Sequence, residues 1–167
     1  MRSLVDFLIN LPEQLAAYFS WLAPLAARIT VGWVFLWSGW EKLNDLPTVI
    51  QNFIDWGIPF PHILTPFVSV VEFVGGLLLL LGLFTRLAAV PLIIVMIVAI
   101  IAAKWAEVDS LETLLGFDEV AYMVLFLWLA VAGPGPISLD RLLQRSCSRQ
   151  TSEEVGTQTF GPAAEAT

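Results

Sequence analysis

The sequence predicts an all-α membrane protein: a transmembrane four-helix bundle with short interfacial helices and a disordered C-terminal tail. Hydrophobic residues make up 57% of the 167 residues and charged residues only 14%, and the mean hydropathy is +0.79. A soluble domain of this length has too little interior to bury so much apolar surface. The apolar residues also form runs long enough to cross a bilayer, with charged, aromatic, glycine or proline residues near their ends.

Four segments are predicted to cross the membrane: residues 21–40, 64–84, 87–103 and 119–132. The third is the clearest, because it holds no polar side chain and is followed by Lys104 and Trp105, a charged and aromatic boundary. The second has only Thr65, Ser69 and Glu72 as polar side chains. The fourth is short for a full crossing and stops at a Gly-Pro-Gly-Pro sequence, since both glycine and proline end helices.

The composition divides the chain into three parts: a cytoplasmic interfacial segment at residues 1–20, a four-span membrane domain at 21–145 and a disordered cytoplasmic tail at 146–167. Between the first two spans, residues 48–56 place apolar side chains at helical spacing with polar ones opposite, which is typical of a helix lying in the membrane interface. The tail is rich in small and polar residues that leave little to pack.

Basic residues near the span ends predict that both termini lie in the cytoplasm, because Lys and Arg are preferentially retained there. Four spans put both termini on one side. The basic residues expected on that side are Arg2, Arg86, Arg141, Arg145 and Arg149, against Lys42 and Lys104 on the other.

The counts of cysteine and histidine and the positions of the acidic residues exclude several classes of function. The single cysteine, Cys147, cannot close an intrachain disulfide, and the single histidine, His62, cannot supply two axial haem ligands or a histidine-rich metal site. The net charge of -7 comes largely from acids between the last two spans and in the tail. Neither a metal site nor a nucleic-acid-binding surface is expected.

Two ionisable residues, Arg28 and Glu72, lie inside predicted spans, where a charge is costly and is typically partnered or functional. Arg28 shares a helical face with Gly32 and Gly39, and Glu72 shares one with Gly76. Helices approach closely where glycines lie, so both faces are expected to turn into the bundle. We therefore expect Arg28 and Glu72 to form an interior ion pair. Such a pair could instead serve only to fix the register of the two helices.

Nearby residues have simpler explanations. The tryptophans near the span ends, Trp37 among them, could stack on an aromatic ligand, but such tryptophans are more commonly interfacial anchors. Lys42, at the outer end of the first span, could bind an anionic head group, although a lysine there more commonly extends toward the membrane surface.

A series of motifs in a fixed order indicates a family. They are Arg28 with Gly32, FLWSGWEKL at 35–43, Gly57-Ile58-Pro59, Glu72 with Gly75-Gly76, and GLFTR at 82–86. This set resembles the DoxX family of small bacterial integral membrane proteins, over about residues 25 to 143. The resemblance implies a four-helix bundle in the bacterial inner (plasma) membrane. It also implies links to thiosulfate:quinone oxidoreduction, to membrane complexes that handle thiol or oxidative stress, and to the maturation of redox enzymes.

The first functional hypothesis is a subunit or accessory of a quinone- or thiol-linked membrane redox system. Arg28 and Glu72, with Ser38, Trp37 and Lys42 nearby, would hold the polar head group of a lipid-soluble ligand such as a quinone. Arg28 would donate to its oxygen, and Glu72 would orient Arg28 or relay a proton. The sequence has no recognisable redox centre or covalent cofactor site, so a redox partner protein would have to exchange the electrons.

Two alternatives remain open at this stage. The protein could be a non-catalytic assembly or interaction protein, in which the ion pair only locks the bundle. It could also be a small-solute or proton permease, since paired intramembrane charges mark transport paths. Four short spans make a cramped transporter, so the permease would have to be a homo-oligomer. The sequence does not decide whether the protein is an enzyme.

Overall fold

The computed structural model describes residues 18–143, and this part of the chain is all-α. Its main helices are α2 (Leu22–Asn44), α3 (Leu46–Asp55), α4 (Pro61–Leu81), α5 (Thr85–Ala99), α6 (Leu111–Leu115) and α7 (Asp118–Ala132). A π-helical turn (Ile100–Lys104) and a 3-10 turn (Trp105–Glu107) continue α5. The expectations for residues 1–17 and 144–167, including the disordered tail, lie outside the described residues.

Three helical segments are long and apolar enough to cross a membrane: Leu22–Asn44, Pro61–Leu81 and Thr85–Glu107. They correspond to the first three predicted spans. The predicted fourth span is α7, whose 15 residues reach about 22 Å at 1.5 Å per residue. That length falls short of the ~30 Å hydrocarbon core of a bilayer, as its sequence indicated. The helix expected at residues 48–56 is present as α3, which buries Phe53.

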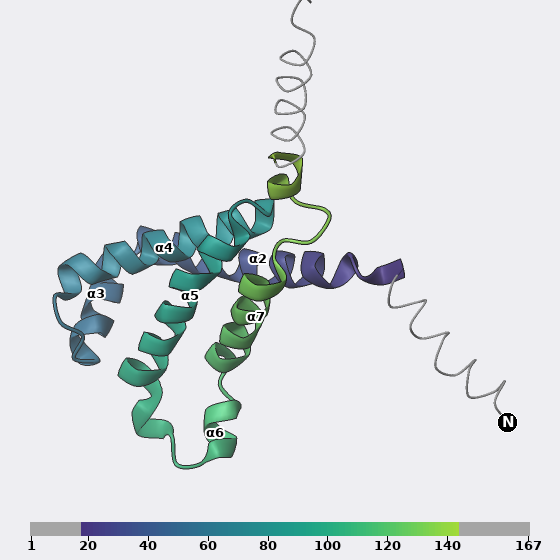
Figure 1. The fold of residues 1–167 in the computed structure, drawn as a ribbon. Coiled ribbons are helices and arrows are strands. Elements are labelled where there is room, and N and C mark those ends of the chain that lie inside the picture. Colours follow the sequence, from purple (N-terminus) through teal and green to yellow (C-terminus); the bar gives the residue numbers. More distant parts are fainter. Residues whose placement is uncertain (1–17, 144–167) are drawn as a thin grey trace, which may run out of the picture.

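Helices α2 and α4 lie along one another in opposite directions, with α3 beside the first turns of α4 (Figure 1). Glycines allow this close approach. A Cβ atom added at Gly39 would collide with the backbone of Phe73, and one at Gly76 would collide with the backbone of Leu36. These contacts fix the register of the two helices, so that Ser38 of α2 lies opposite Glu72 of α4.

Helices α5 and α7 form the second pair and cross the α2–α4 pair (Figure 1). The core lies where the two pairs meet. Phe35 of α2 is nearly perpendicular to two rings of α7, with centroid distances of 4.8 Å to Phe126 and 5.4 Å to Tyr122. On α5, Leu92 is fully buried and lies within reach of Gly75. The buried apolar side chains therefore join all four long helices.

A tight turn joins α4 to α5, and the segment after α7 closes over it. Gly82 has a left-handed φ of 64°, which is the usual way for a helix to end at glycine. The carboxylate of Asp140 accepts hydrogen bonds from the backbone N–H groups of Phe84 at 2.8 Å and Thr85 at 3.3 Å. The Asp140 N–H donates to the Gly82 carbonyl at 3.1 Å. Asp140 thus caps the start of α5 from a distant part of the chain.

Candidate functional site

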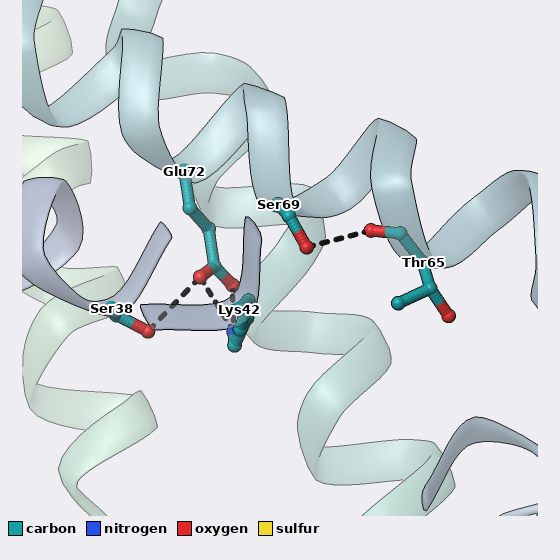
Figure 2. Close-up of polar contacts among 5 residues, drawn as sticks. All are labelled: Ser38, Lys42, Thr65, Ser69 and Glu72. Atoms are coloured by element: carbon teal, nitrogen blue, oxygen red, sulfur yellow. Dashed lines mark hydrogen bonds and ion pairs between the residues drawn. The ribbon is translucent and has the colours of Figure 1, made fainter. Parts of the chain in front are cut away.

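Glu72 is the centre of a polar cluster between α2 and α4, which we call the Glu72 cluster and define as Ser38, Lys42 and Glu72 (Figure 2). Lys42 Nζ donates to both carboxylate oxygens of Glu72, at 2.5 and 2.6 Å. Ser38 Oγ donates to Oε2 at 3.1 Å. Within residues 18–143, the partners of the carboxylate are therefore an ammonium and a hydroxyl, and no guanidinium donates to it.

The two charges of this cluster differ sharply in burial. The Glu72 side chain is 2% exposed, whereas the Lys42 side chain is 31% exposed. A buried carboxylate keeps its charge at tolerable cost only when a cation and hydrogen bonds compensate for lost solvation. Lys42 supplies that compensation, although its side chain is not fully buried. The cluster therefore connects a buried carboxylate to a partly exposed lysine.

Helix geometry explains why Lys42 turns inward. Side chains on an α-helix tilt toward the N-terminus, so a lysine near the end of α2 leans back along the helix, toward Ser38. This direction leads to Glu72. The expectation that Lys42 extends toward the membrane surface was wrong for this reason.

A groove of about 600 Å³ lies beside the cluster. Two tryptophans, Trp37 and Trp40, line it together with Lys42. Glu41 and Asp45, two acids, also line it, and Glu41 accepts a hydrogen bond from the Trp37 indole at 2.8 Å. The volume is in the range of pockets for small molecules, ~300–1,000 Å³. The acidic residues make the groove better suited to a neutral ligand than to an anion.

The predicted ion pair between Arg28 and Glu72 is not formed. Arg28 donates from Nε to the Pro24 carbonyl at 3.3 Å and from Nη2 to the Ile137 carbonyl. Arg28 and Ser38 are ten residues apart on α2, which is about 15 Å along the helix axis. The Arg28 side chain also tilts toward the N-terminus of α2, away from Glu72. Arg28 therefore lies at one end of the α2–α4 contact, beside Gly82, whereas Glu72 lies nearer its middle, opposite Ser38.

Arg28 nevertheless is deeply buried, as predicted, with 1% of its surface exposed. Its guanidinium fills the space over Gly82, where an added Cβ atom would collide with Nη1. The loop after α7 covers the other side through Ile137 and Ser138. Asp140 interacts with Arg28 electrostatically. We call this arrangement of Arg28, Gly82, Ile137 and Asp140 the Arg28 lock.

Two further hydroxyls on α4 point elsewhere. Ser69 Oγ donates to the Thr65 carbonyl at 2.8 Å, within its own helix, and not to Glu72 (Figure 2). The Thr65 hydroxyl is fully buried and has no hydrogen-bond partner among residues 18–143. Neither hydroxyl extends the Glu72 cluster.

The structure thus brings together four of the five residues proposed as a ligand site. Ser38, Lys42 and Glu72 form the cluster, and Trp37 lines the groove beside it. Arg28 lies apart. The sequence placed Lys42 near the predicted ligand site, and its position four residues after Ser38, on the same side of α2, was the signal for its contact with Glu72. The backbone carbonyl of Ile137 carried no such signal, since a carbonyl acceptor is not encoded by residue type.

The long apolar helices and the polar groups buried between them define a helical integral membrane protein. A sequence model of the DoxX family, described simply as DoxX, matches residues 23–105. The chain belongs to the DoxX family. No solved structure matches it.

Its relatives include named bacterial membrane proteins. It is 30% identical to inner membrane protein YqjF of Escherichia coli over 72% of this chain and 92% of that protein. It is 33% identical to inner membrane protein YphA of the same species, over 70% and 87%. It is 28% identical to the Bacillus subtilis protein named "Putative oxidoreductase CatD", over 71% and 85%.

Proposed function

We propose that this protein is a multi-pass subunit or accessory of a quinone- or thiol-linked redox system in the bacterial inner membrane, with both termini in the cytoplasm. The observation that carries the proposal is the contact between a buried carboxylate, Glu72, and a partly exposed lysine, Lys42, beside a groove with two tryptophans. The inner-membrane names of its relatives and the oxidoreductase name of CatD support it.

The Glu72 cluster has the chemistry that a quinone head group requires. A bound quinone would supply an acceptor of two electrons and two protons. Lys42 donates from Nζ to Glu72 and is one of the residues that line the groove, so in this proposal its ammonium donates a hydrogen bond to a quinone carbonyl oxygen there. Trp37 and Trp40 line the groove and offer apolar contacts for a flat ring. The acids Glu41 and Asp45 favour a neutral head group over an anionic one.

Glu72 has two roles in this proposal. It orients Lys42, and it offers a proton-accepting carboxylate within hydrogen-bond distance of the lysine. A proton given up by Lys42 to a ligand oxygen would be replaced from the groove, because the Glu72 carboxylate carries no proton to donate. The electrons would come from a partner protein of the flavin or dithiol class. Arg28 has no part in this site, which corrects the role first expected of it.

The test is a titration of the protein in nanodiscs with a short-chain ubiquinone analogue. Binding is measured as quenching of tryptophan fluorescence. We expect Lys42→Met and Glu72→Gln to weaken binding about tenfold or more, because the first removes the charged donor to the quinone oxygen and the second removes the carboxylate that orients that donor. The matched controls are Lys104→Met and Glu119→Gln. These remove the other Lys–Glu pair, at 2.8 Å, which does not line the groove.

Two outcomes contradict the proposal. Equal affinity in wild type, Lys42→Met and Glu72→Gln would place the analogue elsewhere. Absence of saturable quenching in folded wild-type protein would remove the quinone site altogether. Suppose that the second result is found and that a Lys42→Met/Glu72→Leu double variant also functions normally in cells. The two results together would favour the assembly protein, in which the ion pair only holds the helices in place.

A further inference from the structure

A second groove, of about 400 Å³, lies at the opposite end of the α2–α4 pair, next to the Arg28 lock. Its polar lining includes two arginines, Arg28 and Arg141. Its apolar lining includes Leu25 of α2 and Leu80 and Leu81 of α4. The groove therefore has a positively charged part next to an aliphatic part.

Arg28 brings to this groove a charge that the protein compensates only in part. Within the described part of the chain, its hydrogen bonds go to two backbone carbonyls, and it forms no ion pair with a carboxylate. Asp140 is the carboxylate that interacts with it electrostatically, but both Asp140 oxygens already accept backbone N–H groups of the α5 cap. A guanidinium has five N–H donors, of which two are used here.

The second arginine, Arg141, adds positive charge to the second groove. Arg141 is exposed, and its one hydrogen bond within the described part of the chain is made by its backbone N–H, which donates to Ser138 Oγ at 3.3 Å. Its side chain is therefore available to a ligand in the groove. With Asp140 counted as one negative charge, the two arginines leave a net charge of about +1. The first groove, with Glu41 and Asp45, has the opposite character.

We propose that this second groove binds the phosphate of an anionic phospholipid. Arginine is the preferred residue for phosphate oxygens, because its planar fork presents paired donors. The groove lies at the ends of helices long enough to cross a bilayer, where a lipid phosphate lies at the boundary of the hydrocarbon region. Leu25, Leu80 and Leu81 would contact the acyl chains below that phosphate. The proposal does not depend on the quinone site.

A bound phosphate would also stabilise the fold. Arg28 joins α2 to the loop after α7, and that loop caps α5 through Asp140. A ligand that satisfies the remaining Arg28 donors therefore strengthens a contact among three parts of the chain. We expect phosphatidylglycerol to raise the thermal unfolding temperature relative to phosphatidylcholine, since a ligand that binds only the folded state stabilises it.

The experiment is native mass spectrometry of the full chain, released from nanodiscs of phosphatidylcholine with a minor fraction of phosphatidylglycerol. We expect retention of phosphatidylglycerol in preference to phosphatidylcholine. Arg141→Gln should lower that preference about fivefold or more, because it removes a charge-assisted contact from an exposed position. Arg86→Gln is the matched control: Arg86 is exposed near the same end but does not line the groove.

Arg28→Lys is the second variant, chosen because it keeps the charge and loses the fork. It should fold, as judged by circular dichroism, and should lose most of the preference. The proposal is overturned if wild type retains both lipids equally, or if Arg141→Gln and Arg86→Gln retain phosphatidylglycerol alike. It is also overturned if millimolar inorganic phosphate gives the same thermal stabilisation as the lipid, because the groove would then bind free phosphate.

Discussion

Lys42 Nζ lies 2.5 Å from Glu72 Oε2, so a lysine near the end of α2 neutralises a carboxylate in the middle of α4. The contact extends from the groove into the interior between the two helices. Because one partner is almost fully buried and the other is not, the two residues should respond differently to substitution. This asymmetry separates the Glu72 cluster from an ordinary surface ion pair.

Lys42→Met is expected to destabilise the protein more than Glu72→Gln. Without Lys42, Glu72 remains buried with only Ser38 as a partner, and an uncompensated buried charge costs about 3–5 kcal/mol. Without the carboxylate, Lys42 can turn toward its exposed side at lower cost. Unfolding of the protein in mixed micelles by increasing SDS measures the difference. Equal losses in the two variants would contradict the burial asymmetry.

Gly39→Ala and Gly76→Ala are expected to separate α2 from α4. Each added methyl group would collide with backbone of the facing helix, which cannot move aside as a flexible side chain can. Overpacking of this kind costs about 1–3 kcal/mol or more. Gly116→Ala is the control, because its Cβ would make ordinary contacts at 3.4 Å. Thermal unfolding in detergent should show a lowered midpoint for the first two variants and little change for the third.

Asp140→Ala is expected to loosen the start of α5. Loss of a side chain that caps a helix costs about 1 kcal/mol, and here it also removes the carboxylate near Arg28. Hydrogen–deuterium exchange at the Phe84 and Thr85 amides should become faster. Exchange in the middle of α7 should stay as in wild type. Unchanged protection at both amides would mean that the cap seen here does not persist in the membrane.

The orientation is a prediction that Cys147 can test, because it is the only cysteine in the chain. If both termini are cytoplasmic, a membrane-impermeant maleimide should label Cys147 in inverted vesicles and not in intact spheroplasts. An Asn44→Cys variant in a Cys147→Ser background should give the reverse pattern, because Asn44 ends α2 at the other side. Labelling of Cys147 in intact spheroplasts would reverse the proposed topology.

The sequence predicted the helices and their inward faces well, because those depend on patterns along one helix. Apolar runs gave the spans, and the spacing of Gly32, Gly39 and Gly76 gave the α2–α4 contact. The burial of Arg28 and Glu72 followed from their positions on those faces, and both predictions are confirmed. These features need no knowledge of how far one helix is shifted along its neighbour.

The partners of Arg28 and Glu72 could not be predicted from patterns along one helix. They depend on the register between α2 and α4 and on the tilt of side chains toward the helix N-terminus. That tilt carries Arg28 toward the loop after α7 and Lys42 toward Glu72. The Arg28 lock also depends on a backbone carbonyl and on a loop more than one hundred residues away, at Ile137. Neither is visible as a residue pattern.

The most direct test of the account is a pair of double-mutant cycles on unfolding free energy. One cycle combines Lys42→Met with Glu72→Gln, and the other combines Arg28→Met with Glu72→Gln. We expect a coupling energy of about 1–3 kcal/mol in the first cycle and coupling within about 0.5 kcal/mol of zero in the second, since only residues in contact couple strongly. Strong coupling between Arg28 and Glu72, with none between Lys42 and Glu72, would contradict the site described above.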